Sequence, residues 1–124
     1  MPNEATDEAA AGPKGPAGFG PPPFLTLSAI TRDFGGPRPA LDNVTVSFRR
    51  GEIHAVVGEN GAGKSTLMNV LFGLQQPDAG GILIDGREAV HRAPRDAIAH
   101  GIGMVHQHFR LVPRFTVAEN IRLA

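Results

Sequence analysis

The sequence predicts an α/β fold, and two features of its 124 residues indicate it. An apolar, β-branched run at Ile53–Val57 leads into a glycine-rich loop at Gly58–Thr66, and helical apolar spacing continues to Phe72. Strand, glycine-rich loop and helix in this order make a known α/β unit. Upstream, Val44–Phe48 alternates apolar and polar residues, which indicates a half-buried strand in an antiparallel sheet. We therefore expect an antiparallel β lead-in followed by the start of a parallel core.

The chain divides into a tail, residues 1–23, and a folded part, residues 24–124. Fifteen of the first 23 residues are Ala, Gly or Pro, and they show no apolar periodicity. Such a segment cannot bury enough apolar surface to offset the entropy lost on ordering, so we expect it to be disordered. Its early acidic residues and the lack of an apolar stretch after them do not fit a secretory signal.

The first half of the folded part should contain three strands. The predicted strands and the turns between them are Phe24–Ile30, the turn Gly35–Pro39, Val44–Phe48, the turn Arg50-Gly51, and Ile53–Val57. The last run is apolar almost throughout, as expected of a central strand covered on both faces. His54 within it should then be a hydrogen-bonded core histidine.

The second half alternates helices and short strands. The predicted elements are a helix from about Lys64 to Gly73, a turn at Pro77–Gly81, a strand at Ile82–Ile84 closed by Asp85-Gly86, a helix at Pro94–His100 followed by Gly101, and a second core strand at Ile102–His106. Thr116 and Glu119 have the spacing of a capping box, which predicts a helix that is cut off at Ala124.

Composition excludes several classes of protein. Twelve basic and twelve acidic residues give a net charge of zero, so no global field attracts nucleic acid or an anionic membrane surface. Cysteine is absent, which removes disulfides and thiolate metal sites. No apolar run approaches the roughly 18 residues needed to span a bilayer.

The loop Gly58–Thr66 fits the phosphate-binding pattern G-x-x-x-x-G-K-[ST]. Backbone amides can surround a phosphate only where side chains do not block the approach, which explains the glycines at Gly58, Gly61 and Gly63. The following helix directs unpaired amides and its positive dipole end at the same point. Lys64 adds a mobile cation that can reach the β and γ phosphates.

The two hydroxyls after the lysine complete the motif. Ser65 can coordinate Mg²⁺, and Thr66 can donate a hydrogen bond to phosphate oxygens. The candidate phosphate-binding residues are therefore Gly58, Glu59, Asn60, Gly61, Ala62, Gly63, Lys64, Ser65 and Thr66.

Residues 24–124 resemble the ATP-binding cassette (ABC) family, the ATPase subunits of ABC transporters. The matching runs are Ala40–Val44 and Gly51–Ile53 before the loop, the loop itself, Met68–Leu74 with Pro77–Gly80, Ile84–Gly86, Gly103–Phe109 with Leu111–Pro113, and Thr116–Ile121. The sequence His106-Gln107-His108-Phe109 is most similar to cassettes that import simple sugars or nucleosides. In that branch the full protein usually carries two cassettes in tandem, so the resemblance implies that this chain belongs to the first.

The resemblance implies ligands, site residues and partners. Phe34, 24 residues before Gly58, matches the aromatic that stacks on adenine. Gln107 matches the family's Q-loop glutamine, which ligates Mg²⁺ or orients the attacking water. The implied cofactors are ATP and Mg²⁺, with Ser65 and Gln107 as metal ligands. The implied partners are membrane permease subunits, reached through the Q-loop region, and a second cassette, without nucleic acid. The implied location is cytoplasmic, peripheral to the inner face of the cell membrane.

Other residues near these motifs are expected to have structural roles. His106 and His108 flank Gln107, but no third ligand lies nearby in sequence, so we expect structural or loop histidines. Asp85 follows an apolar run, as in a Walker B strand, but Gly86 comes next and Asp-Gly favours a turn.

The family's later motifs do not occur in this chain: the Leu-Ser-Gly-Gly-Gln signature, the Walker B Asp-Glu pair and the switch histidine. The resemblance therefore implies the N-terminal fragment of a cassette, inactive as an ATPase alone. We also expect an exposed sheet edge and an exposed apolar face on the helix at 116–124. Two alternatives stay open: a soluble ABC-type ATPase that is not a transporter component, and a non-catalytic nucleotide-binding remnant.

Overall fold

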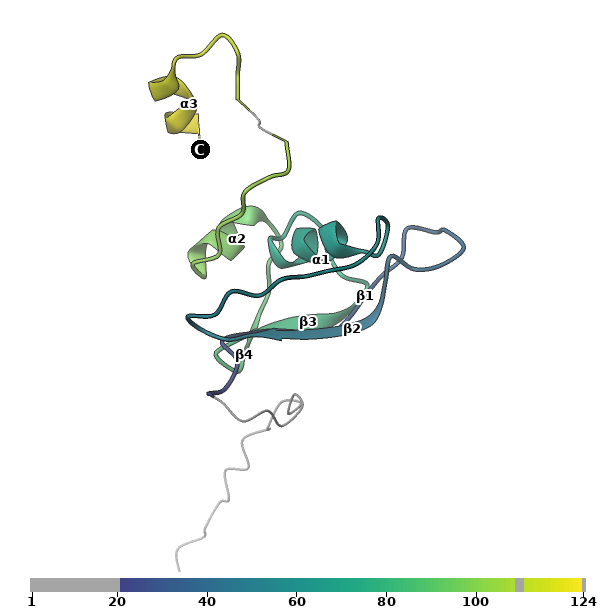
Figure 1. Cartoon of the computed structure of the whole chain (residues 1–124). Helices are drawn as coiled ribbons and strands as arrows, with labels where there is room; N and C mark the ends of the chain where they lie inside the picture. The colour runs from purple at the N-terminus through teal and green to yellow at the C-terminus, as the bar shows by residue number, and fades with distance from the viewer. Residues whose placement is uncertain (1–20, 109–110, 124) are drawn as a thin grey trace, which may run out of the picture.

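The computed structural model describes residues 21–108 and 111–123. Within these ranges the elements are β1 (Leu25–Arg32), β2 (Leu41–Phe48), α1 (Lys64–Leu71), β3 (Ala79–Ile84), β4 (Arg87–Ala89), α2 (Pro94–Ala99) and α3 (Val117–Leu123). The strands form one antiparallel sheet in the order β2-β1-β3-β4, and α1 and α2 lie on one of its faces (Figure 1). The predicted tail at 1–23 lies almost entirely outside the described residues.

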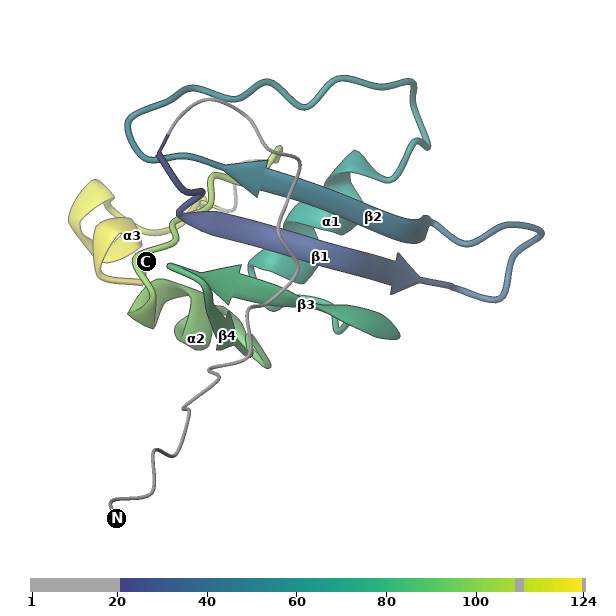
Figure 2. The ribbon, with the colours of Figure 1, turned by 90° about the horizontal axis from the view of Figure 1, so that it is seen from below.

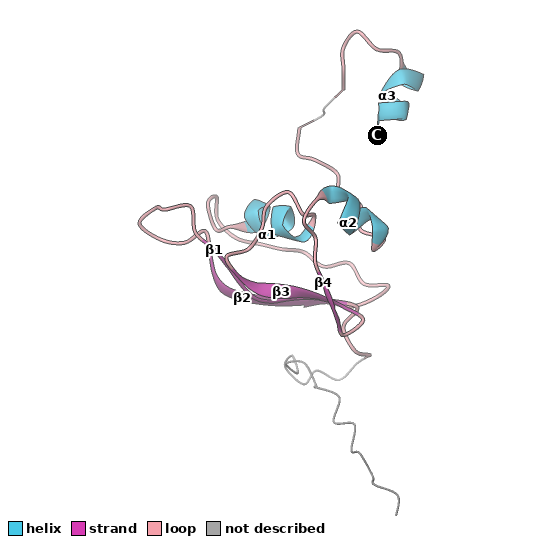
Figure 3. Cartoon of the chain, turned by 180° about the vertical axis from the view of Figure 1, so that it is seen from behind, coloured by secondary structure: helices cyan, strands magenta, loops and turns pink. Residues whose placement is uncertain are grey.

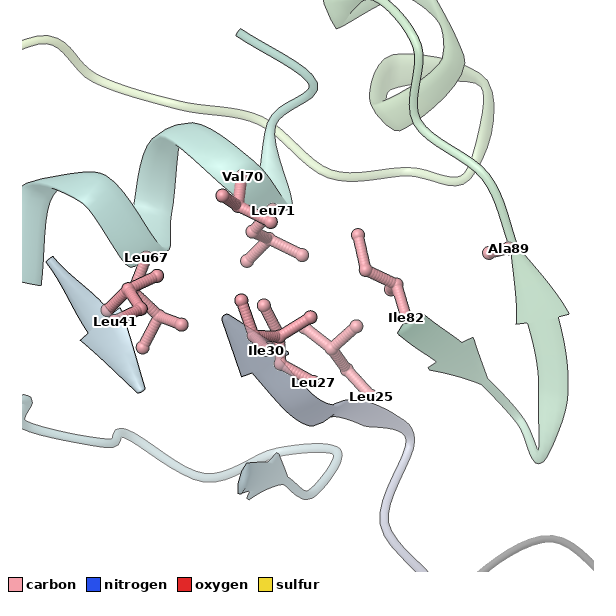
Figure 4. Close-up of a cluster of buried hydrophobic side chains, with 9 residues drawn as sticks. All are labelled: Leu25, Leu27, Ile30, Leu41, Leu67, Val70, Leu71, Ile82 and Ala89. Carbon is pink, nitrogen blue, oxygen red and sulfur yellow. The ribbon is translucent and has the colours of Figure 1, made fainter. Parts of the chain in front are cut away.

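The core lies between α1 and the sheet. Apolar side chains from all four strands meet three from α1 there (Figure 4). The cluster consists of Leu25, Leu27, Ile30, Leu41, Ile82 and Ala89 from the sheet and Leu67, Val70 and Leu71 from the helix. Leu27, Ile30 and Val70 are completely buried. The alternating pattern of the strands and the helical spacing after Lys64 therefore place their apolar residues on a common interface, as predicted.

The strand β3 begins earlier than the sequence suggests. The turn predicted at Pro77–Gly81 is wrong from Ala79 onward, because Ala79 and Gly81 pair with β1. An extra residue in β1 bulges at Ala29, which has a φ of 52°. A Cβ at Gly80 would overlap with the backbone carbonyl of Ala29, so glycine at this position lets the two strands approach.

The turn at Asp85-Gly86 is confirmed. Its residues have φ values of 48° and 76°, which is the type I′ conformation of a two-residue hairpin between β3 and β4. In this turn the Asp85 carboxylate forms an ion pair with Arg50, whose Nη2 lies 2.9 Å from Oδ2. Asp85 is therefore a turn residue, and the rejection of a Walker B role for it agrees with the geometry.

The two predicted core strands are not formed. Residues 53–57 and 102–106 are irregular, and Ile53, Val57 and Val105 have exposed fractions of 102%, 89% and 93%. A parallel strand takes its hydrogen bonds from segments distant in the sequence. Among the described residues no strand pairs with either segment, so their apolar composition alone does not make them strands.

The two C-terminal helices follow their predicted start and stop signals. The helix α2 has Pro94 at its first position and Gly101, with a φ of 80°, after its end. Before α3, the Thr116 amide donates to the Glu119 carboxylate at 2.8 Å, and the Glu119 amide donates to the Thr116 hydroxyl at 3.3 Å. This is the predicted capping box. No residue of α3 is buried, and the helix stands apart from the sheet (Figure 1). In the described part of the chain, no helix is long and apolar enough to cross a membrane.

Candidate functional site

The glycine-rich loop folds into a tight turn directly before α1. The Ala62 amide donates to the Glu59 carbonyl at 3.1 Å, and the Leu67 amide donates to the Gly63 carbonyl at 2.9 Å as the first bond of the helix. Gly61 and Gly63 have φ values of 85° and 94°, in the left-handed region that glycine adopts without strain. The predicted change from loop to helix at Lys64 is therefore confirmed.

The end of this loop touches the loop between β1 and β2. A Cβ on Gly63 would overlap with the Ala40 carbonyl and would lie 2.9 Å from the Leu41 side chain. Glycine thus permits backbone contact between two segments that are 23 residues apart in sequence. Both loops lie at the same end of the sheet (Figures 1 and 2).

The loop and the first turn of α1 present a positive, hydrogen-bond-donating surface. The amides of Gly61, Gly63, Lys64, Ser65 and Thr66 have no hydrogen-bond acceptor among the described residues. The first turn of α1 contains no acidic residue that would oppose the helix dipole. These are the properties of an anion-binding helix N-terminus.

The lysine of the motif lies against its own loop. The Lys64 ammonium donates to the Gly58 carbonyl at 2.6 Å and to the Glu59 carbonyl at 2.7 Å. Both acceptors are uncharged and exposed. A charged phosphate oxygen is a stronger acceptor than a carbonyl, so these bonds can be exchanged for bonds to an anion.

A cavity of about 480 Å³ adjoins the start of α1. It brings together Lys64 and Ser65 from the phosphate loop with Gln107, which is 42 residues beyond Ser65. Its lining residues are Val56, Lys64, Ser65, Met68, Asn69, Met104, Val105, His106, Gln107 and His108. No carboxylate is among the described residues of this lining.

The donor set of the cavity suits a hard divalent cation with a polyphosphate. The Ser65 hydroxyl and the Gln107 amide oxygen are oxygen ligands of the kind Mg²⁺ prefers. The few protein ligands match its habit of keeping several waters and binding substrate phosphates. The residues present therefore fit a nucleotide–Mg²⁺ complex.

Phe34 lies outside this cavity, in the loop between β1 and β2. Its exposed fraction is 57%, and the guanidinium carbon of Arg32 lies 4.8 Å from the centre of its ring. The loop that carries it ends at Ala40, beside Gly63. Six residues span at most about 22 Å, so Phe34 lies within that distance of Ala40, which contacts the phosphate loop.

The histidines occupy different environments from one another. His106 and His108 line the cavity on either side of Gln107, and the ring of His106 lies edge-on to Phe72 with 6.4 Å between centres. The core role expected of His54 is wrong, because residues 53–57 do not enter the sheet. His54 instead accepts a hydrogen bond from the Arg49 amide at 3.3 Å.

A second histidine pair, which sequence reasoning missed, supports the far end of α1. His91 is buried, and its Nδ1 bonds the Leu71 carbonyl at 2.6 Å, while its Nε2 lies 3.1 Å from Nδ1 of His100. This pair links the C-terminus of α1 to the end of α2. Figure 3 shows these two helices on the same side of the sheet. No local pattern marks it, since its members come together only through the fold.

Comparison with known proteins identifies the family. Residues 41–124 match the ABC transporter family, so the chain belongs to it. The guanosine import ATP-binding protein NupO of Bacillus subtilis is 61% identical over 84 residues, which are 68% of this chain and 16% of NupO. The glucose import ATP-binding protein TsgD13 of Haloferax volcanii is 52% identical over 101 residues, which are 82% of this chain and 18% of TsgD13. The matched part of the chain thus spans less than a fifth of the length of these relatives.

Solved structures agree with this assignment. The ATP-binding cassette MJ1267 of an ABC transporter is 30% identical with a TM-score of 0.66, over 73% of this chain and 35% of that one. The cassette MJ0796, solved as a dimer with ADP and phosphate, is 30% identical with a TM-score of 0.66, over 80% of this chain and 45% of that one. The fold is therefore that of an ABC ATPase cassette, represented here in part.

Proposed function

We propose that this chain carries the ATP-binding part of an ABC importer ATPase that drives uptake of a simple sugar or nucleoside. The relatives named above are import ATP-binding proteins for guanosine and glucose, and an arabinose import protein of Azospirillum brasilense is 49% identical over 111 residues. Because these proteins are about five to six times as long as the aligned part, transport belongs to the whole assembly. ATP binding belongs to the residues described above.

One observation carries the proposal: the phosphate loop and Gln107 line the same cavity. Unpaired amides lie in the loop and the first turn of α1, at Gly61 and at Gly63 to Thr66. The Lys64 ammonium is held beside them by exchangeable bonds. Together they supply directed hydrogen bonds and one positive charge. A terminal triphosphate needs both, because its charge is dense and its oxygens accept several bonds.

Each residue has a definite part in this scheme. The ammonium of Lys64 moves from the two carbonyls to the β and γ phosphates, and the amides hold the phosphate oxygens. Thr66 donates its hydroxyl to a phosphate oxygen. Ser65 and Gln107 would hold Mg²⁺, which neutralises phosphate charge when bound. Phe34 offers a flat π surface to the adenine.

The described lining of the cavity contains no carboxylate that could act as a base toward water. Hydrolysis needs a base or orienting group for water and charge compensation across the γ phosphate. We propose that the rest of the protein and a second cassette supply these groups. The region around Gln107 would contact membrane permease subunits at the inner face of the cell membrane.

Nucleotide-dependent stabilisation tests the proposal. Mg²⁺–ATP at 100 times its dissociation constant should raise the melting temperature of the chain by roughly 10 °C. Lys64→Ala should remove this shift. Lys14→Ala changes the chain's other lysine, outside the described residues, and should keep the shift. An absent shift in the unaltered chain, or an equal shift in Lys64→Ala, would reject the assignment.

The importer role needs a separate experiment. The full-length protein should co-purify with a membrane permease, and ATP turnover in that complex should rise on addition of the transported sugar or nucleoside. Full activity without a permease would instead favour the soluble ABC-type ATPase.

A further inference from the structure

An ion pair anchors the loop that carries Phe34. Nη1 of Arg32 donates to Oδ1 of Asp78 at 2.8 Å, and the Asp33 amide donates to Oδ2 of the same carboxylate at 2.7 Å. Asp78 is itself fixed to β1, because its amide donates to the Thr31 carbonyl at 2.8 Å. The two residues before Phe34 are therefore held at the point where β1 ends.

The same arginine covers one face of the Phe34 ring. Its guanidinium carbon lies 4.8 Å from the ring centre, within the range of a cation–π interaction. The ring is still 57% exposed, which leaves most of its remaining surface accessible. The Asp78 carboxylate, the Arg32 guanidinium and the Phe34 ring thus form a series of contacts that ends at the candidate base-stacking surface.

We propose that Asp78 and Arg32 are positioning residues for nucleotide-base binding: they hold the Phe34 ring in place for an adenine to stack on its exposed face. This inference rests on the proposed function. Asp78, at which this series of contacts starts, lies 44 positions after Phe34 in the sequence, directly before β3.

The physical reason is preorganisation. A ring in a free loop loses rotamer and backbone entropy when a base stacks on it, and this loss weakens binding. A loop that is already hydrogen-bonded at Asp33 and backed by a guanidinium has lost that freedom beforehand. The Asp33 amide and then Arg32 also hold the pKa of Asp78 below its ordinary value, so the carboxylate stays charged at neutral pH.

The chain contains a matched control at the other end of β3. Asp85 pairs with Arg50 at 2.9 Å, and the Arg50 guanidinium carbon lies 3.8 Å from the centre of the Phe24 ring. The chemistry is the same carboxylate–arginine–phenyl series. In Figure 2 the segment after β2 starts at this end of the sheet and crosses to the opposite end before it enters α1. Asp85→Asn therefore removes an equivalent ion pair without touching the proposed base site.

The experiment compares two ligands of the whole 124-residue chain by calorimetry: Mg²⁺–ATP and Mg²⁺–tripolyphosphate, which lacks the base. Asp78→Asn and Arg32→Gln should each weaken ATP binding about two- to fivefold, the size expected of exposed cation–π and ion-pair contributions. Tripolyphosphate affinity should not change, and it also reports that the phosphate loop is folded. The double variant should lose no more ATP affinity than either single variant, because both substitutions break the same series of contacts to Phe34.

The outcomes separate the two proposals. Loss of both ligands in Lys64→Ala supports the phosphate site, and retention of both would reject the proposed function. Given a working phosphate site, the inference is overturned by unchanged ATP affinity in Asp78→Asn and Arg32→Gln. It is also overturned by equal losses for ATP and tripolyphosphate, or by an equal ATP loss in Asp85→Asn. If Asp78→Asn does not fold, Arg32→Gln alone gives the result.

Discussion

Replacing Gly63 by alanine should destabilise the chain far more than the same change at Gly61. Both positions have a positive φ, 94° and 85°, so each alanine costs about 1–2 kcal/mol for the left-handed conformation. Only at Gly63 does the new methyl group meet other atoms, the Ala40 carbonyl and the Leu41 side chain, whereas nothing lies within 4 Å of it at Gly61. Overpacking of this kind adds typically 1–3 kcal/mol.

The difference between the two variants therefore isolates the contact between the phosphate loop and the loop after β1. Gly63→Ala should lose about 2–5 kcal/mol in total, and Gly61→Ala about 1–2 kcal/mol. With a urea m-value of about 2 kcal/mol/M, the unfolding midpoints should fall by roughly 1–2.5 M and 0.5–1 M. The assay is urea unfolding followed by circular dichroism without nucleotide. Equal midpoints for the two variants would refute the packing of Gly63 against Ala40.

Three further outcomes follow from the core, the capping box and the cavity. Val70→Ala removes two methyl groups from a completely buried position and should cost about 2–4 kcal/mol in unfolding free energy, measured in the same titration. The Thr116 amide, and then the Thr116 hydroxyl, lower the pKa of Glu119. Its contribution to α3 is therefore complete above the unfolded value of 4.5 and is lost as pH falls through the lower folded value. The protection of the α3 amides, measured as their exchange rate relative to that of an unfolded chain at the same pH, should fall over that acidic range. In Glu119→Gln this pH dependence of protection should disappear. The 124-residue chain should bind ATP without measurable phosphate release, and turnover that disappears in Lys64→Ala would contradict this.

The elements that were predicted correctly rest on local signals. In each of them, residues only a few positions apart determine the local structure. They are the alternation at 44–48, the apolar spacing after Lys64, the Asp85-Gly86 turn and the Thr116–Glu119 capping box. The same holds for the phosphate loop, whose glycine positions and lysine make one connected motif. The structure places these features where the sequence indicates them.

The features that were missed depend on distant partners. Residues 53–57 and 102–106 have the composition of strands, but a strand forms only when another segment supplies hydrogen bonds. The early start of β3 depends on a bulge at Ala29, about 50 residues upstream. His91 with His100, and Asp78 with Arg32, pair across the fold, and nothing in their neighbouring residues indicates it.

The most direct test of the account is the response of individual backbone amides to ligand. In ¹H–¹⁵N spectra of the chain, Mg²⁺–ATP and Mg²⁺–tripolyphosphate should both produce their largest shifts at residues 58–66, while Phe34 should respond to ATP alone. Shifts concentrated in another part of the chain, or no shifts at residues 58–66, would contradict the claim that this loop holds the terminal phosphates.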